Sequence, residues 1–288
     1  MRILVTGAAG FIGTNLIKHL RKVHPDWEIL GIDNYFTGSE DNHVEGVKYK
    51  RMNTFNLMYR ELTCNYNPDI VFHFGEYSRI VKSFDDSEYV MNTNLRGTSH
   101  VLEYCVKNNA KLIYSASSSK FGNNGDDENL SPYSWAKAKM VELIKNYHEW
   151  FELQYEICYF FNVYGPGQIM TGDYATVIGI FERQLKEGKK LTVVSPGTQS
   201  RDFTHVEDVV RGVEKTIHTN LNREWMLRSG INITIEDVAK LYSDKWELIP
   251  ERRGERFTSE EFPSDTEKTL DWKPEKSLKE WIEYVKTR

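Results

Sequence analysis

A tyrosine and a lysine stand four residues apart in the segment Tyr133-Ser-Trp-Ala-Lys137, and Ser117 precedes them by sixteen residues. Two side chains four residues apart on a helix lie on the same face, so Lys137 can reach the Tyr133 phenol. A phenol is a poor base at neutral pH because its reference pKa is about 10, but a neighbouring ammonium favours the phenolate. The three residues predict a site that moves a proton at a carbinol carbon. The alternative is an exposed helix with an incidental tyrosine and lysine.

A glycine-rich segment, Gly7-Ala-Ala-Gly10-Phe-Ile-Gly13, follows the apolar run Ile3–Thr6. In a strand–loop–helix unit of this kind, Gly7 permits the tight turn, Gly10 lets a pyrophosphate approach the backbone, and Gly13 lets helix and strand pack closely. The N-terminus of the helix that begins near Phe11 then faces the phosphates. The segment therefore predicts a dinucleotide-binding site.

Asp33 ends the second apolar run, twenty residues beyond Gly13. A carboxylate at this place accepts hydrogen bonds from a ribose diol and repels a 2′-phosphate, which favours NAD over NADP. The alternative is an aspartate that forms a turn before Asn34. We expect NAD as the cofactor.

Short apolar runs alternate with helical stretches over the first 160 residues. They predict strands, apolar on both faces as in a parallel sheet covered by helices on either side, at Ile3–Thr6, Ile29–Gly31, Val47–Tyr49, Ile70–His73, Leu112–Ser115 and Tyr155–Phe160. Helices are expected over Trp135–Phe151 and Ser87–Asn108. This alternation predicts an α/β fold with a doubly wound parallel sheet of the Rossmann type.

The character of the chain changes after Gly167, where loops lengthen and charge rises. We expect an NAD-binding Rossmann domain at residues 1–162, with residues 200–218 packing back onto it. A smaller C-terminal substrate-binding lobe is expected from residues 163–199 and 219–288, beside the carboxyl ends of the strands, where such sheets bind ligands.

The composition excludes several classes of function. A net charge of −5 gives no electrostatic footprint for nucleic acid, and no apolar run approaches the roughly 20 residues that a membrane span needs. The three cysteines, Cys64, Cys105 and Cys158, have no metal-ligand spacing and are expected as reduced thiols. The histidines form no metal pattern, so no metal is expected. The sequence enters a strand at once, so we expect no signal peptide and a cytoplasmic protein.

An ordered series of motifs resembles the short-chain dehydrogenase/reductase superfamily, and more narrowly its extended group of NAD-dependent sugar-nucleotide epimerases and dehydratases. The series covers nearly the whole chain and reads TGAAGFIG, IDNYFTG, PDIVFHFG, YSASSSKFG, SPYSWAK, FNVYGPGQ, RDFTHVEDVV and a late RRGE. Such a series is highly specific for the family and much less specific for the substrate.

The resemblance implies three catalytic residues. Family members place a serine or threonine five residues before a glycine, and counting back from Gly122 selects Ser117, with Ser115, Ser118 and Ser119 as competitors. Tyr133 is the general base of the family, and its lysine, here Lys137, reaches both the phenol and the cofactor ribose.

The resemblance also implies two sets of binding residues. The cofactor set is Gly7, Gly10, Phe11, Ile12, Gly13, Asp33, Asn34, Asn53, Thr54, Phe74, Gly75, Asn94, Tyr133 and Lys137. The family's asparagine at Asn94 supports the lysine, although a surface asparagine is the ordinary alternative. The substrate set is Glu76, Ser117, Ser118, Asn162, Arg201, Arg252 and Glu255. Guanidinium groups suit pyrophosphate oxygens, but Arg201 could instead pair with Asp202 or Asp208.

The reaction expected from the resemblance is epimerisation at C4 of a UDP-hexose or UDP-N-acetylhexosamine through a transient 4-keto sugar, as in enzymes like UDP-glucose 4-epimerase. Dehydratases of the group carry Asp-Glu, and decarboxylases carry a glutamate, where this chain has Ser118 and Ser119. The alternatives are a nucleotide-sugar dehydratase or reductase, or an epimerase at another carbon, in deoxysugar or surface-polysaccharide synthesis. A different class would be a non-catalytic NAD-binding sensor.

Some positions depart from the family pattern. Glu76 introduces a carboxylate where small residues usually follow the histidine; it could contact a sugar hydroxyl, act as an extra acid or base, or pair with Arg79. Arg79 could also replace a lysine that meets the NAD phosphates in some 4-epimerases. The residue that limits sugar size is expected near Ser259–Phe262.

The helices that carry Asn94 and Tyr133 present apolar residues beyond what one sheet face needs, among them Trp150 and Phe151. Family members pair these helices across a dimer axis, so we expect a homodimer with a nucleotide-sugar substrate as its small-molecule partner. Packing of these helices onto the small lobe is the alternative.

Overall fold

A sheet of seven parallel strands forms the centre of the computed structural model, which describes residues 1–59, 66–121, 127–254, 257 and 263–288. Its spatial order is β3-β2-β1-β4-β5-β6-β9. The strands are β1 (Arg2–Thr6), β2 (Glu28–Asp33), β3 (Lys48–Arg51), β4 (Ile70–His73), β5 (Lys111–Ser117), β6 (Tyr155–Phe160) and β9 (Glu224–Leu227). The predicted α/β fold is confirmed, and β2 and β5 extend beyond their expected ends.

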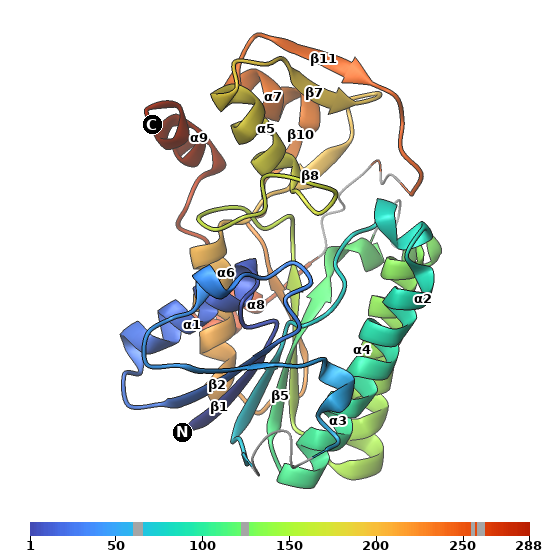
Figure 1. The fold of residues 1–288 in the computed structure, drawn as a ribbon, viewed down its shortest axis with the longest axis vertical. Helices are drawn as coiled ribbons and strands as arrows, with labels where there is room; N and C mark the ends of the chain where they lie inside the picture. Colours follow the sequence, from blue (N-terminus) through green and yellow to red (C-terminus); the bar gives the residue numbers. More distant parts are fainter. Residues whose placement is uncertain (60–65, 122–126, 255–256, 258–262) are drawn as a thin grey trace.

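Helices cover both faces of this sheet (Figure 1). Helices α1 (Phe11–Val23) and α6 (Val206–Lys215) lie on one face, and α3 (Gly97–Asn108) and α4 (Pro132–Phe151) lie on the other. Successive side chains of a strand point to opposite faces, so Ile3 and Val5 join the core under α1 and α6, while Leu4 joins the core under α3 and α4. The strands therefore read as continuous apolar runs.

The helix expected over Ser87–Asn108 is not uniform. It consists of α2 (Ser87–Val90), a π-helical stretch at Met91–Arg96, and α3. Within that stretch the Thr93 hydroxyl donates to the carbonyl oxygen of Tyr89 at 2.8 Å, which offers the backbone an alternative to the regular ladder. Such π-helical turns frequently mark functional sites.

Helix α4 begins three residues earlier than the apolar pattern indicates. Pro132 occupies its first turn, and the Ser131 hydroxyl accepts a hydrogen bond from the Ser134 backbone N–H at 3.1 Å. Proline in the first turn and serine at the N-cap are both typical of a helix start. Tyr133 and Lys137 consequently lie in the first two turns, at the end of the helix nearest the cavity described below.

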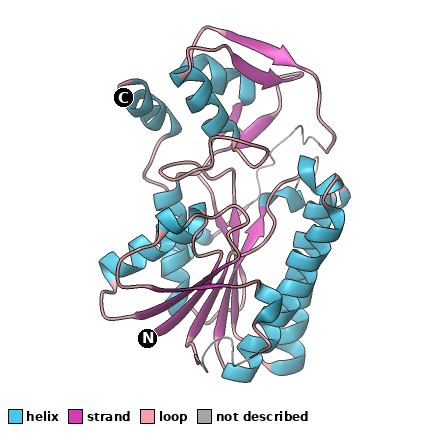
Figure 2. Cartoon of the chain, viewed as in Figure 1, coloured by secondary structure: helices cyan, strands magenta, loops and turns pink. Residues whose placement is uncertain are grey.

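A smaller lobe lies beyond the carboxyl ends of the strands (Figures 1 and 2). It contains helices α5 (Val177–Lys186), α7 (Ile235–Tyr242) and α9 (Leu278–Lys286). It also contains a parallel pair, β7 (Leu191–Val194) with β11 (Trp246–Ile249), and an antiparallel pair, β8 (Ser200–Asp202) with β10 (Asn232–Thr234). Short 3₁₀ turns lie at Glu40–Asn42, Thr54–Asn56, Val81–Phe84, Ser118–Phe121, Asp127–Asn129 and Thr216–His218.

The boundaries between the domain and the lobe stay a prediction. The position of strand β9 differs from the predicted division. That strand falls in the range 219–288 yet pairs with β6 in the large sheet, and α8 (Thr266–Leu270) packs against it. Cys105 and Cys158 are buried free thiols, whereas Cys64 lies outside the described residues. Within the described part of the chain, no helix combines the length and the apolar character needed to cross a membrane.

Candidate active site

A cavity of about 530 Å³ opens at the carboxyl ends of the strands. The strand order reverses between β1 and β4, and ligands of doubly wound sheets bind at this kind of switch point. The glycine segment after β1 and the residues after β4 line one part of the cavity, and the smaller lobe lines another. A single cavity thus joins the sites predicted for the cofactor and for the substrate.

The backbone of the glycine segment packs too closely for larger side chains at two positions. A Cβ on Gly13 would lie 2.1 Å from the Gly7 carbonyl oxygen, and Gly7 has a φ of +67°. Gly10 caps α1 without a side-chain hydrogen bond, so the first N–H groups of this helix face the cavity. The segment can therefore receive a phosphate group, as the sequence predicts.

Asp33 is buried at the end of β2 and lines the cavity. Its carboxylate accepts hydrogen bonds from the backbone N–H groups of Ala9 at 2.9 Å and Tyr35 at 2.7 Å. It therefore fixes the turn, as in the alternative interpretation. Two carboxylate oxygens offer about four acceptor positions, so capacity remains for a ribose diol.

The other predicted cofactor residues lie around the same cavity, with one exception. The lining includes Phe11, Ile12, Asn34, Asn53, Thr54, Phe74 and Gly75. Asn94 is fully buried and outside this lining, so it is not a surface asparagine. Its amide donates to the Tyr77 carbonyl at 3.0 Å and accepts from the Tyr77 N–H at 2.8 Å. Asn94 thus fixes the loop after β4.

Ser117 and Tyr133 both line the cavity. The Ser117 hydroxyl accepts hydrogen bonds from the Ser119 hydroxyl at 2.9 Å and the Ser119 backbone N–H at 3.2 Å. A hydroxyl has two acceptor positions and one donor, so Ser117 keeps its hydrogen for another oxygen. No residue in the described ranges forms a hydrogen bond with the Tyr133 hydroxyl.

Lys137 pairs with Glu76. Its ammonium donates to the Glu76 carboxylate, to the Ser115 carbonyl and, at 3.3 Å, to the Tyr114 hydroxyl. The side chains of Lys137 and Glu76 are 6% and 2% exposed. Glu76 lines the cavity but does not pair with Arg79, whose guanidinium instead donates to the Tyr174 carbonyl.

A buried hydrogen-bonded chain extends from Glu76 to β1. The Thr98 hydroxyl donates to Glu76 at 2.9 Å and contacts His73 Nε2 at 2.8 Å. The Thr6 hydroxyl contacts His73 Nδ1 at 2.7 Å. Burial lowers the pKa of His73 to about 4, which keeps the imidazole neutral. Burial, reinforced by Glu76, raises the pKa of Tyr114 well above its usual value.

Three more residues predicted to bind the substrate line the cavity: Asn162, Arg201 and Arg252. Arg201 lies on β8, and the Asn162 amide donates to the Asp202 carbonyl at 2.8 Å. The Asp208 carboxylate pairs with Arg211, and Ser118 also lines the cavity. Glu255 and the segment Ser259–Phe262 lie outside the described residues.

An aromatic group that sequence reasoning missed lies where the sheet meets the lobe. Phe36 packs against Tyr89 and Tyr174, with ring centroids 4.6 and 5.2 Å apart. The hydroxyls of Tyr77 and Tyr174 donate to one carboxylate, Asp86, at 2.8 and 3.1 Å. The four rings come from separate segments, and only the excess of tyrosine and phenylalanine near residues 35–36, 77 and 89 could have pointed to them.

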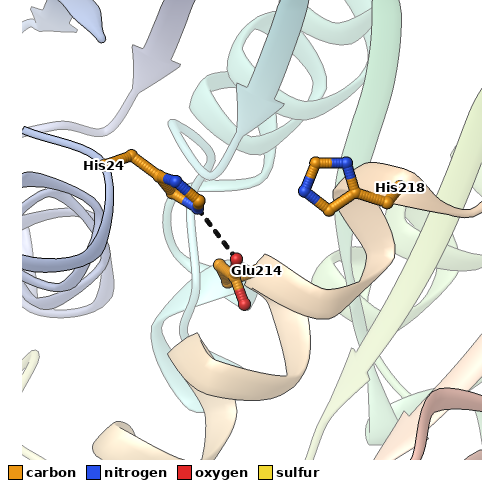
Figure 3. Close-up of side chains that lie close together, drawn as sticks. All are labelled: His24, Glu214 and His218. Atoms are coloured by element: carbon orange, nitrogen blue, oxygen red, sulfur yellow. Dashed lines mark hydrogen bonds and ion pairs between the residues drawn. The ribbon is translucent and has the colours of Figure 1, made fainter. Parts of the chain in front are cut away.

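A second group of polar side chains, His24, Glu214 and His218, has donor types used for zinc (Figure 3). His24 Nε2 lies 2.9 Å from a Glu214 oxygen, and the His24 ring stacks on Trp27. This separation is that of a direct hydrogen bond, which holds the two groups together without an ion. His24 and Glu214 are 190 residues apart, so no local spacing could have predicted their contact.

Comparison with known proteins places the chain among enzymes of sugar nucleotides. The pattern of the NAD dependent epimerase/dehydratase family matches residues 3–224. ADP-L-glycero-D-manno-heptose-6-epimerase of Brachyspira hyodysenteriae is 30% identical over 244 residues, which make up 79% of this chain and 75% of that protein. UDP-glucuronic acid decarboxylase 6 of Arabidopsis thaliana is 32% identical over 229 residues, 74% of this chain and 65% of that protein.

A solved structure gives the same result. The crystal structure of UDP-glucose 4-epimerase from Thermotoga maritima with UDP-glucose superimposes with a TM-score of 0.93 at 25% identity, over 100% of this chain and 98% of that chain. The resemblance inferred from the motifs is thereby confirmed at the level of family and fold.

Proposed function

Because the chain belongs to the NAD-dependent epimerase/dehydratase family, we propose that it epimerises a nucleotide-activated sugar at C4 through a transient 4-keto sugar. A UDP-hexose or UDP-N-acetylhexosamine is the proposed substrate. One observation carries the proposal: a single cavity is lined by the glycine segment, by Ser117, Tyr133 and Lys137, and by Asn162, Arg201 and Arg252. Cofactor, proton-transfer and phosphate-binding groups thus surround one space.

The residues present fit the NAD of the family. A Cβ at Gly7 or Gly13 would clash with backbone atoms of Gly75 or Gly7, so glycine keeps the turn tight, and the N-terminus of α1 has no side-chain cap. Asp33 faces the same cavity with a carboxylate, which suits a ribose diol and opposes a 2′-phosphate. Bound NAD would accept a hydride from the sugar and return it.

The protein's own groups supply the proton chemistry. In the proposal, Tyr133 removes the proton of the C4 hydroxyl and gives it back at the end of the cycle. Ser117 has a hydroxyl hydrogen free to bind the same sugar oxygen, because both its acceptor positions are occupied by Ser119. Lys137 places a positive charge near the phenol, which favours the phenolate.

Arg201 and Arg252 would hold the pyrophosphate of the substrate, and Asn162 would support it. They line the same cavity as the phosphate-binding glycine segment. A substrate held by its pyrophosphate can present either face of a 4-keto sugar to the same cofactor, since the sugar can rotate about these bonds. This geometry supports epimerisation.

Decarboxylation and dehydration are less well supported, although several relatives are UDP-glucuronic acid decarboxylases. Both reactions use carboxyl groups after the strand-end hydroxyl residue in related enzymes, and this chain has Ser118 and Ser119 there. The Ser119 hydroxyl donates to Ser117, and serine does not titrate near neutral pH.

We also propose that two copies of the chain form a homodimer through α3 and α4. Trp150 and Phe151, at the end of α4, are 59% and 51% exposed, which is high for large apolar side chains. Exposed aromatic residues of this kind are typical of interfaces.

The direct test is to incubate the purified protein with UDP-glucose and with UDP-N-acetylglucosamine and to assay for the C4 epimers. The Tyr133→Phe variant should lose at least about 10²-fold in turnover while keeping bound NAD, because general base catalysis typically contributes that much. Absence of turnover with a panel of nucleotide sugars would contradict the proposal. If the purified protein retains bound NAD, the cofactor is reduced and reoxidised within one catalytic cycle, as an epimerase requires. If the protein instead needs added NADPH for turnover, it is a reductase.

A further inference from the structure

Lys137 uses all its donors on the surrounding protein. An ammonium has three N–H groups, and its three acceptors are the Glu76 carboxylate, the Ser115 carbonyl and the Tyr114 hydroxyl. The longest of these contacts, 3.3 Å to Tyr114, is the one most easily exchanged for another acceptor. Glu76 and Ser115 therefore determine where the ammonium lies.

The hydrogen bonds behind Glu76 have one consistent direction. The Thr6 hydroxyl accepts from the backbone N–H groups of Phe74 and Gly75, so it donates its hydrogen to His73 Nδ1. His73 then carries its hydrogen on Nε2 and donates to Thr98, and the Thr98 hydroxyl donates to Glu76. Every group in the chain is satisfied when Glu76 is an ionised acceptor. Its negative charge is thus built into the fold beside the positive charge of Lys137.

We propose that Glu76 is a positioning residue that holds the Lys137 ammonium at the ends of β4 and β5 and offsets its positive charge beside Tyr133. This inference rests on the proposed function, in which Tyr133 is the base. It assigns Glu76 to Lys137 rather than to the substrate, because Lys137, Thr98 and Tyr114 take three of the about four acceptor positions of its carboxylate.

The charged and titratable groups around Tyr133 come from several elements, because Tyr77, Tyr89 and Tyr174 share its cluster, and burial raises the pKa of each of these three phenols. Lys137 lies on α4, Glu76 and Arg79 follow β4, and Tyr114 comes from β5, with His73 behind Glu76. His73 and Tyr114 stay neutral near pH 7, since burial shifts their pKa values away from it. Arg79 is bound to the Tyr174 carbonyl and is unchanged by a substitution at Glu76. Replacing Glu76 by glutamine therefore changes one charge near Tyr133.

The test is an ultraviolet titration of the tyrosinate signal in the NAD-loaded protein, with the Tyr133→Phe protein subtracted in each background. In Glu76→Gln the Tyr133 signal should appear at a pH lower by about one unit, the order of shift that a single nearby charge produces. Glu76→Asp keeps the charge and should leave the midpoint within about half a unit of the native value. An unchanged or higher midpoint in Glu76→Gln overturns the proposal.

The matched control is Glu142→Gln, which removes an exposed carboxylate paired with Lys139 on the same helix and should not move the midpoint. If Glu76→Gln does not fold, the double variant Glu76→Gln/Lys137→Met, which like the native pair has no net charge, is titrated instead. Its midpoint should stay close to the native value, and a rise of more than about one unit would mean that Lys137 acts unopposed in the native protein.

The titration involves no turnover, so it separates the two proposals. A shifted midpoint without conversion of any nucleotide sugar would remove the proposed reaction and leave the role of Glu76. Conversion of a nucleotide sugar with an unshifted midpoint would remove the role of Glu76 and leave the proposed reaction. In an active enzyme, the acid limb of the pH dependence of kcat/KM should move to lower pH in Glu76→Gln by the same amount as the midpoint.

Discussion

His73 is a buried imidazole that works as a connector between two hydroxyls, Thr6 and Thr98. A neutral histidine has one donor and one acceptor, so His73 can accept a hydrogen bond from Thr6 on β1 and donate one to Thr98. Thr98 in turn donates to Glu76 in the loop after β4. Each partner in such a buried chain is costly to lose, because the group left behind has no water to replace it.

Removing the Thr98 hydroxyl tests how much the buried hydrogen-bonded chain stabilises the fold. Thr98→Val keeps the shape but leaves His73 Nε2–H without its acceptor and deprives Glu76 of one donor, so the free energy of unfolding should fall by about 1–3 kcal/mol. Thr98→Ser retains the hydroxyl and should lose much less. Urea unfolding of the three proteins measures both values, and equal losses in the two variants would contradict the hydrogen-bond argument.

The neutral state of His73 also predicts a pH dependence of stability. Its pKa is lowered to about 4 in the folded protein and is about 6.5 when unfolded, so the unfolded chain binds more protons between these values. The contribution of His73 is fully present above about pH 6.5 and is lost as the pH falls towards 4, by about 3 kcal/mol in total. Chemical unfolding at pH 7 and pH 4.5 should show a larger loss in the native protein than in His73→Gln, and parallel losses would refute the assignment.

At the scale of elements, the glycine segment and the segment after β4 are fitted to each other. A Cβ on Gly75 would lie 2.8 Å from the Gly7 nitrogen, and a Cβ on Gly7 would lie 2.8 Å from the Gly75 nitrogen. The two segments therefore meet backbone to backbone at the switch point of the sheet, where no side chain can be inserted.

Two alanine substitutions in the glycine segment should have different effects. In Gly13→Ala the new Cβ would lie 2.1 Å from a backbone oxygen, which should destabilise the cofactor-free protein by about 2–3 kcal/mol. In Gly10→Ala the closest atom is 3.3 Å away, so the fold should be kept within about 1 kcal/mol while NAD affinity falls. Thermal unfolding and calorimetric titration with NAD separate these effects; a Gly10→Ala protein with unaltered affinity would contradict the phosphate-binding role.

Local sequence signals account for much of this architecture. Apolar runs predicted six of the strands, and the glycine spacing predicted the loop after β1. The sequence could not reveal the contact between Glu76 and Lys137, because the two residues are 61 positions apart and meet only when β4 and β5 lie side by side. The π-helical stretch was missed for a similar reason, since Asn94 is fixed by the backbone of Tyr77 from another segment. Strand β9 was missed because its four residues, Glu224–Leu227, begin with a charged residue and stand in a polar region, whereas the equally short β4 is apolar throughout its first three residues.

At the scale of the whole molecule, the lobe and the sheet share one polar and aromatic contact region. The Arg79 guanidinium binds the Tyr174 carbonyl, with Nε at 2.7 Å, and Asp86 receives hydroxyls from Tyr77 and Tyr174. Sheet, cavity and lobe are consequently joined next to the predicted reaction centre, so the placement of the lobe and of Glu76 depends on the same short loop.

The proposed homodimer is tested by light scattering. A mass twice the 33.7 kDa of the chain is expected for the native protein, and Trp150→Glu should shift the population towards monomer, because it places a charge in an apolar contact. Val23→Glu, an exposed apolar position on α1, serves as the control and should leave the mass unchanged. A monomer mass for the native protein at working concentration would remove the proposal.

The seven residues from His73 to Arg79 carry four different tasks in immediate succession: a neutral imidazole, a carboxylate for the lysine, a backbone fixed by Asn94, and a guanidinium bound to the lobe. Inserting or deleting one residue would put every later group out of register with its partner. Natural relatives that keep Glu76 should therefore preserve the length of this loop, whatever variation they accept in the turns at the opposite edge of the sheet.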